Sequence, residues 1–175
     1  MSVLFGDKAT FAIESVTAID QPEPFGGLGP MVHLTYWVAD QQIGDPNLPT
    51  YAEYLEKGLR HHLADRGHRR NDSLHTRPAK DLATLLGDWP DAERATRERW
   101  SAHDISRPLD RSEYAGDGHG DWVVHIVEDR QSGRVLAYSQ ATPAGFIEAQ
   151  TRPGEVDQAL MQAWKAMQAL LEPTS

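Results

Sequence analysis

A repeat of apolar residues near the C-terminal end is the feature that most constrains the fold. Its side chains fall on one face of a helix with about 3.6 residues per turn. They are Val156, Leu160, Ala163, Trp164, Met167, Leu170 and Leu171. Pro153 is typical of a first helical turn and Pro173 of the end of a helix. The sequence therefore predicts an amphipathic helix between these two prolines, with its apolar face packed against the rest of the chain.

Segments rich in β-branched and aromatic residues precede this helix and predict strands. Phe11 and Ile13 lie on one face of the first, because side chains alternate along a strand. Residues 130–133 form a turn that joins two of the segments into a hairpin. The predicted strands are residues 9–19, 31–38, 122–129 and 134–141, with a short one within 144–150.

A helix is predicted directly after residue 50. Thr50 and Glu53 have the spacing of a capping box, in which each side chain satisfies the backbone N–H of the other. An apolar stripe at a spacing of four follows, formed by Tyr51, Leu55, Leu59 and Leu63. Gly67 is a suitable helix stop. The polar residues 65–77 are expected to be exposed.

The sequence between residues 78 and 121 predicts less regular structure. Pro78 suits the start of a further helix, in which Leu82, Leu85 and Leu86 face a core. A second helix is expected over residues 90–100, and residues 101–121 are expected to be irregular. The segment 20–30, with three prolines and three glycines, predicts a loop, and residues 39–42 a tight turn.

Strands first, helices in the middle, then strands and a closing helix predict an α+β fold with a mostly antiparallel sheet. The 175 residues suit one domain, which we take to span residues 1–175. No apolar run approaches the roughly 20 residues of a transmembrane helix, so no membrane partner is expected. Residues 1–7 lack the basic start and long apolar stretch of a signal peptide, which favours a cytoplasmic location.

The formal net charge of −9 is distributed unevenly along the chain. Residues 1–60 carry 8 acids and 3 bases, residues 61–111 carry 9 and 10, and residues 112–175 carry 9 and 4. An acidic surface argues against nucleic acid as a partner, because phosphates attract lysine and arginine. It would speed the encounter with a basic partner. Acidity that only maintains solubility is the alternative.

Eight histidines raise the question of a metal site. The best-spaced set is His61, His62 and His68, but consecutive histidines on a helix diverge by about 100° and cannot face one ion. His62 lies near the apolar stripe, where a packed imidazole is the commoner outcome. The sequence has no His-Glu-x-x-His motif, and without cysteine it has no thiolate site.

The segment GDGHGD, residues 116–121, is the other candidate for chemistry. In an extended chain Asp117, His119 and Asp121 lie on one side, which would suit a metal-dependent hydrolase. Asp-Gly pairs also form turns readily, because Asp bonds its own backbone and Gly tolerates positive φ. We favour a flexible loop that leads into the strand at Trp122. His125 then belongs to that strand, on the face opposite Val124.

Other catalytic patterns are absent from the sequence. It has no Gly-x-Ser-x-Gly nucleophile elbow and no phosphate loop ending in Lys-Ser/Thr. Glu128 and Asp129 are adjacent, so on a strand they point to opposite faces and cannot act as an acid/base pair. We therefore expect a protein that is not an enzyme and binds no cofactor.

Two short motifs resemble a known family. FGDKATFAIE, residues 5–14, is similar to the opening of a family of immunity proteins from bacterial polymorphic toxin systems. YWVADQQIGDPNLPTYAEYL, residues 36–55, resembles the next block of that family, and the hairpin at 122–141 followed by a helix has the order of its C-terminal half. The basic, His-rich segment 60–77 has no clear counterpart.

The resemblance implies an inhibitor that binds a cognate protein toxin and blocks its active site. If that toxin is a nuclease with a basic cleft, an acidic inhibitor could mimic phosphates with carboxylates. The acidic loop would then be a contact surface, with an aromatic anchor of the type enriched at interfaces. The predicted contact residues are Glu113, Tyr114, Asp117, Asp121 and Trp122. Core packing is the alternative for Trp122, an adaptor domain is the alternative function, and a homodimer stays open.

Overall fold

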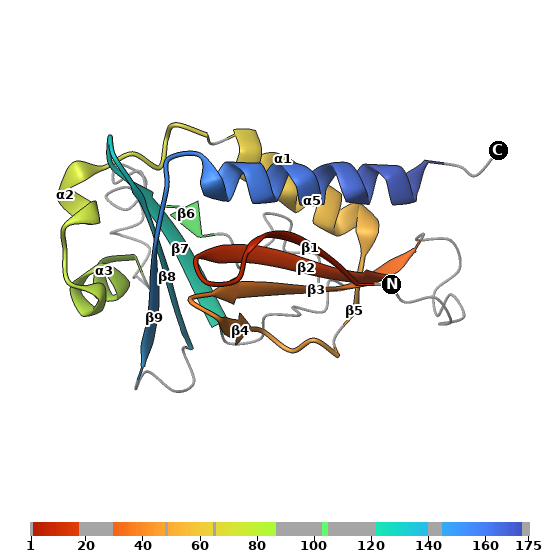
Figure 1. Cartoon of the computed structure of the whole chain (residues 1–175), viewed down its shortest axis with the longest axis horizontal. Helices are drawn as coiled ribbons and strands as arrows, with labels where there is room; N and C mark the ends of the chain where they lie inside the picture. The colour runs from red at the N-terminus through yellow and green to blue at the C-terminus, as the bar shows by residue number, and fades with distance from the viewer. Residues whose placement is uncertain are drawn as a thin grey trace, which may run out of the picture.

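The computed structural model places two sheets and four helices within the part of the chain that it describes (Figure 1). That part comprises residues 2–17, 30–47, 49–64, 66–86, 103–104, 122–139 and 145–172. All strand pairs within the two sheets are antiparallel. The α+β class and the largely antiparallel pairing predicted from sequence are therefore confirmed.

The first sheet, sheet A, is built from the N-terminal part of the chain. Its strand order is β1-β2-β3-β4, and β5 pairs with a different part of β3. Its strands are β1 (Ser2–Asp7), β2 (Phe11–Thr17), β3 (Met31–Val38), β4 (Gln41–Ile43) and β5 (Pro49–Tyr51). The turn between β3 and β4 places Ala39 and Asp40 at positive φ, which confirms a tight turn at these two residues. The other two residues of the turn expected at 39–42, Gln41 and Gln42, belong to β4.

The second sheet, sheet B, carries the predicted hairpin. Its order is β6-β7-β8-β9. The strands are β6 (His103–Asp104), β7 (Trp122–Glu128), β8 (Gly133–Ser139) and β9 (Phe146–Thr151). The strand β6 corrects the expectation of an irregular 101–121 at two residues, because His103 and Asp104 pair with Ile126 and His125.

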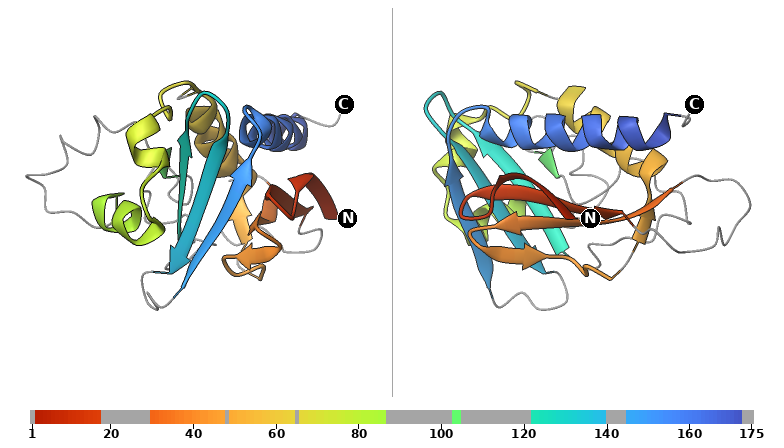
Figure 2. Two further views of the ribbon diagram at one scale, coloured as in Figure 1. Left: turned by 60° about the vertical axis from the view of Figure 1, so that its left-hand side comes forward. Right: turned by 45° about the vertical axis from the view of Figure 1, so that its right-hand side comes forward.

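Four helices cover the sheets: α1 (Ala52–Ala64), α2 (Asp72–His75), α3 (Ala79–Leu86) and α5 (Glu155–Leu171). In Figure 2 α2 and α3 lie on one side of β7, β8 and β9, and α5 lies on the other side. None of the described helices is long and apolar enough to cross a lipid bilayer.

The main core fills the space between the two sheets and the inner faces of α1 and α5. Phe11 and Ile13 of β2, Val124 of β7 and Leu160 of α5 are fully buried in it. A second apolar cluster joins the outer face of sheet B to α2 and α3, where Leu74 and Leu82 contact side chains of β7 and β8. Sheet B is therefore covered on both faces, whereas sheet A has its helices and its partner sheet on one face.

Most predicted elements are confirmed with small shifts of their ends. β3 has the predicted bounds, β2, β7 and β8 begin and end within two residues of theirs, and α5 begins two residues after Pro153. The helix predicted after Thr50 begins at Ala52, because Thr50 itself belongs to β5. The predicted helix at 90–100 lies outside the described residues, as does the loop 20–30 apart from Pro30.

Two expectations need correction. Residues 65–77 are not uniformly exposed: Arg69 and Leu74 are buried, and residues 72–75 form the short helix α2. The sequence patterns also do not predict β1, although it forms the outermost described strand of sheet A. Both departures arise from long-range contacts, because Leu74 packs on sheet B and β1 pairs with β2.

Candidate functional site

Four of the five predicted contact residues, Glu113, Tyr114, Asp117 and Asp121, lie outside the described residues. The fifth, Trp122, is the first residue of β7, opposite Ser139 of β8. Its side chain is partly buried and packs against the main core. Core packing thus uses at least part of this ring, and a contact role for the loop stays a prediction.

The described histidines and carboxylates do not gather into a metal site. Within the described ranges no group of three or more His, Asp or Glu side chains is placed to hold an ion. His61 and His68 are exposed, whereas His62 is 2% exposed and packed, as its place beside the apolar stripe predicts. Asp117, His119 and Asp121, the alternative metal set, lie outside the described residues.

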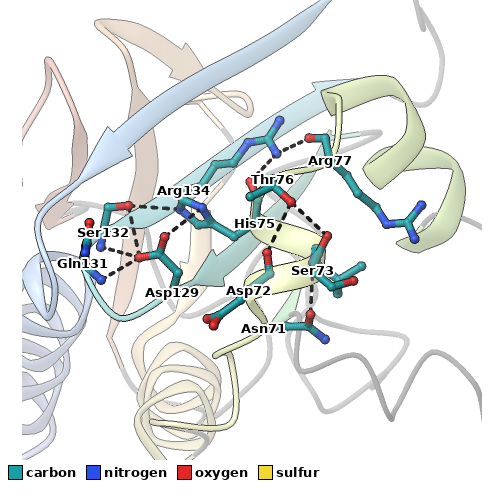
Figure 3. Close-up of polar contacts among 11 residues, drawn as sticks. Asn71, Asp72, Ser73, His75, Thr76, Arg77, Asp129, Gln131, Ser132 and Arg134 are labelled. Carbon is teal, nitrogen blue, oxygen red and sulfur yellow. Dashed lines mark hydrogen bonds and ion pairs between the residues drawn. The ribbon is translucent and has the colours of Figure 1, made fainter.

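A serine, a histidine and an aspartate do meet at the turn between β7 and β8 (Figure 3). His75 Nδ1 lies 3.3 Å from an oxygen of Asp129, and His75 Nε2 lies 3.3 Å from the Ser132 hydroxyl. Asp129 also accepts the backbone N–H groups of Gln131 and Ser132, each at 2.7 Å. These two backbone bonds are the largest causes of the lowered pKa of Asp129.

This arrangement is a turn anchor rather than a nucleophilic triad. In a triad the serine hydroxyl donates to the histidine, and the aspartate only orients the imidazole. Here the same Asp129 oxygen that closes the turn also accepts the Ser132 hydroxyl at 3.3 Å. The carboxylate therefore fixes the hairpin turn, and His75 ties α2 to it.

Arg134 extends this anchor along β8 (Figure 3). Its buried guanidinium donates to the carbonyl oxygens of His75 and Arg77 and, at 2.7 Å, to the carboxylate of Glu148. Carbonyl oxygens at and after the end of α2, which have no partner within the helix, thereby accept hydrogen bonds from Arg134. The outer side of sheet B is held to α2 by this set of bonds, which gives it a structural role.

A buried ion pair joins the segment after α1 to the first turn of α5. The Arg69 side chain is 1% exposed and pairs with the carboxylate of Asp157, which is 10% exposed. The second oxygen of this carboxylate lies 3.2 Å from Nε of the more exposed Arg66. Nε and Nη1 of Arg69 have no hydrogen-bond partner among the described residues.

The outer face of sheet A carries a second polar cluster, built around Glu14. Its carboxylate accepts the Ser2 hydroxyl at 2.6 Å, the Lys8 ammonium at 2.9 Å and the Trp37 indole N–H at 2.9 Å. The ammonium of Lys8 also lies 3.6 Å from the centre of the Trp37 ring, a cation–π contact. Side chains from β1, from the turn between β1 and β2, and from β2 thus form one network that holds the indole ring in place. We call Lys8, Glu14 and Trp37 the Trp37 platform.

The donors around Glu14 change its acidity. The pKa of Glu14 is lowered, first by the hydrogen bond from Ser2 and then by that from Lys8, although partial burial acts in the opposite direction. A lowered folded-state pKa stabilises the fold above the unfolded pKa of about 4.3, and this stability is lost as the pH falls through the folded value.

We therefore expect Glu14→Gln to lower the free energy of unfolding by about 1 to 2 kcal/mol at pH 7. The difference from the parent protein should shrink as the pH falls below about 4, because Glu14 becomes neutral in the parent as well. Urea denaturation at a series of pH values measures this. A difference that stays constant between about pH 7 and about pH 3 would contradict the assignment.

Two apolar side chains of β1 are exposed, and one of them lies beside the platform. Val3 is 44% exposed and Leu4 is 45% exposed. Leu4 is paired with Glu14 in register, so its side chain shares the outer face with the platform. On the other side of Trp37 the paired residue is Gln42 of β4, which is also exposed. The outer face thus combines an indole, an aliphatic side chain and polar groups.

A protein-family model described as "Immunity protein 42" matches residues 1–166 of the chain. The chain belongs to this family of immunity proteins. The resemblance read from the two sequence motifs is thereby confirmed, and the match covers nearly all of the chain. Neutralisation of a toxin is accordingly the function of the protein, and neither the described residues nor the comparisons support the alternative of a metal-dependent hydrolase.

Among solved structures, the chain is similar to one described as CdiI from Burkholderia dolosa AUO158. The two share 15% sequence identity with a TM-score of 0.62, over 94% of this chain and 99% of that one. At this identity the likeness concerns the fold. No curated protein matches the chain.

Sequence reasoning missed the Trp37 platform although its elements were visible. The alternation along residues 31–38 places Tyr36 and Val38 on one face and Trp37 on the other. A tryptophan opposite the apolar face of a strand is a signal for a solvent-facing ring. The contribution of Lys8 could not be read in the same way, because it depends on the unexpected pairing of β1 with β2.

Proposed function

We propose that this immunity protein inhibits its toxin as a non-catalytic, stoichiometric ligand, and that the toxin surface it covers is basic. The match to the immunity family over residues 1–166 is the observation that supports a toxin as the partner. The net charge of −9 supports a basic contact surface, because unlike charges on two proteins raise the rate of encounter. A nuclease, with a cleft that binds phosphates, is the toxin class that fits this charge best.

The acidic loop is the first contact region that we propose. It contributes the carboxylates of Glu113, Asp117 and Asp121, and Tyr114 and Trp122 add aromatic surface. Tyrosine and tryptophan are enriched among the residues that dominate binding energy at interfaces. The loop would thus supply both the charge and the anchor of an interface. Inhibition takes place in the cytoplasm under this proposal, and the immunity protein acts there without a cofactor.

The test is binding of the purified full chain to the toxin domain encoded immediately upstream, followed by calorimetry and stopped flow. We expect one-to-one binding, and an on-rate that falls at least about tenfold when the salt concentration rises from about 50 to about 500 mM. Asp117→Lys/Asp121→Lys should slow association much more than Asp81→Lys/Glu172→Lys. The second pair of residues is exposed on α3 and at the end of α5, and it changes the net charge equally.

Three results would contradict parts of the proposal. If association is insensitive to salt, the toxin surface is not recognised by charge, whatever the affinity. If the two double variants slow association equally, the net charge of the molecule matters and the loop has no special place in the interface. If the parent chain leaves the toxin active at equimolar concentration, stoichiometric inhibition of that toxin is wrong.

A further inference from the structure

We propose that the outer face of sheet A, centred on Trp37, is a docking surface for the basic face of the cognate toxin. The inference rests on the proposed function, because it takes the basic toxin as the occupant. The residues of this face are others than those of the acidic loop, and three features support the proposal: the platform geometry, the exposure of neighbouring side chains and the local charge.

The described elements leave this face of sheet A open. α5 and sheet B pack against the opposite face, the one that carries Phe11 and Ile13. In Figure 1 the strands β1 to β4 lie in front of β7, and no described helix or strand lies across their near side. An open sheet face in a small protein is normally polar, with one side solvated. This one instead presents an indole ring and the aliphatic side chain of Leu4.

The Trp37 ring on this face is already fixed. The indole N–H is bonded to Glu14, and the ammonium of Lys8 lies over the ring. Glu14 in turn holds both Lys8 and Ser2. An aromatic side chain held in one conformation loses little entropy on binding, and pre-organisation of this kind raises affinity. The Trp37 ring is therefore both aromatic and held in one conformation, two properties that suit a contact residue.

Sheet A and its turns carry an excess of acidic residues. The described residues of sheet A and its turns, 2–17, 30–47 and 49–51, contain four acids and one base. They are Asp7, Glu14, Asp40 and Asp45 against Lys8. The single base is already occupied by Glu14 and the Trp37 ring. Asp7, Asp40 and Asp45 lie in or next to the turns of the sheet, so these described ranges carry a net charge of −3. The complementary occupant is therefore a surface rich in lysine or arginine.

These features fit a basic toxin surface better than they fit a second copy of the chain. A symmetric dimer through this face would bring the same acidic residues of two copies together, and like charges across an interface oppose association. A toxin surface with basic side chains around an apolar patch meets both the carboxylates and the surface formed by Leu4 and Trp37. The docking face thus selects the toxin by charge and holds it by an aromatic anchor.

The experiment compares two glutamine-to-lysine variants of the full chain. Gln42→Lys adds a positive charge directly opposite Trp37 on the outer face of sheet A. Gln150→Lys makes the same change on an exposed strand position of β9 in sheet B. Each variant has the same net charge, and both replace solvent-exposed side chains. Because Gln150 pairs in register with Arg134, the melting temperature of each variant is measured first, and binding is compared at a temperature at which both variants are folded. Calorimetry with the toxin domain encoded upstream measures the dissociation constant of each.

We expect Gln42→Lys to weaken binding by at least about tenfold and Gln150→Lys by less than about twofold. A third variant, Leu4→Ala, shortens an exposed side chain. It should also weaken binding, but the salt dependence of binding should not change. If the two lysine variants weaken binding equally, or neither does, the docking face is wrong. The proposed inhibition by binding still holds in that case, because the parent chain binds the toxin. If the parent chain fails to bind, both proposals fail together.

Discussion

We expect replacement of Asp157 by asparagine to lower the free energy of unfolding by about 3 to 5 kcal/mol, because it leaves a buried guanidinium without its carboxylate. Arg69 is 1% exposed, and Nε and Nη1 of its guanidinium have no other partner among the described residues. The asparagine amide could still accept a hydrogen bond, but it would not neutralise the charge. Urea denaturation at neutral pH, followed by circular dichroism, measures the loss.

The double variant Arg69→Met/Asp157→Asn is the matched control. Methionine fills part of the same volume without a charge, so the double variant should be more stable than Asp157→Asn alone. Glu148→Gln provides a second comparison, since Glu148 pairs with another buried arginine, Arg134, from a more exposed position at 36%. Glu148→Gln should lower the free energy of unfolding by less than Asp157→Asn does. A loss below about 1 kcal/mol for Asp157→Asn would show that the pair contributes little to stability.

Gly6→Ala should lower the free energy of unfolding by about 2 to 5 kcal/mol. Gly6 has φ +97°, a conformation that costs other residues about 1 to 2 kcal/mol. In addition, an added Cβ would overlap the carbonyl oxygen of Phe11 and lie 3.2 Å from Cβ of Ala159. Relief of such overpacking costs about 1 to 3 kcal/mol more, since it requires backbone of β2 or α5 to move. Thermal and urea denaturation both report the change.

Gly67→Ala separates the two contributions. Gly67 also has positive φ, at +86°, but an added Cβ would meet no atom within 4 Å among the described residues. The alanine there should cost only the conformational strain, about 1 to 2 kcal/mol. Equal losses at the two glycines would mean that the contact with Phe11 relaxes freely, and the close approach of β1 to α5 would then be unimportant for stability.

Local patterns predicted much of the fold, through helical spacing in one segment and β-branched, aromatic composition in others. The stripe from Val156 to Leu171 is apolar at helical spacing, and it forms α5. The run 31–38 and the two segments of the hairpin about residue 130 are rich in β-branched and aromatic residues, and they form β3, β7 and β8. In α5 the apolar stripe includes the buried Val156, Leu160, Ala163 and Met167, and β8 is buried along its whole length, so composition and packing agree.

The departures occur where a distant partner decides the outcome. Arg69 belongs to a polar segment that predicts exposure, yet it is buried because Asp157, 88 residues later, supplies its countercharge. Likewise β1 is only six residues long, and four of its side chains other than Gly6 are exposed; its pairing with β2 makes it a strand. A local sequence pattern carries no information on such pairings, because it does not show which distant segment a residue will meet.

Of the two candidate contact surfaces, the sequence predicted one and not the other. The acidic loop was visible from sequence because Asp, Gly and Trp are concentrated within residues 116–122. The outer face of sheet A was not, since Leu4, Glu14 and Trp37 come from three strands and meet only in the register of β1, β2 and β3. The motifs that indicate the family include Glu14 and Trp37, but a motif does not show that its residues meet across a sheet.

The contact of β1 and β2 with α5 has a consequence for the synthesis of the protein. Thr10 donates to Glu155 across 145 residues of chain, and Ala159 of α5 closes on Gly6. The ribosome adds roughly 5 to 20 residues per second, so the N-terminal sheet waits several seconds for the helix that completes its core. We therefore expect a nascent chain that is arrested before α5 to lack this contact, and expect neutralisation of a toxin to depend on the completed synthesis of α5.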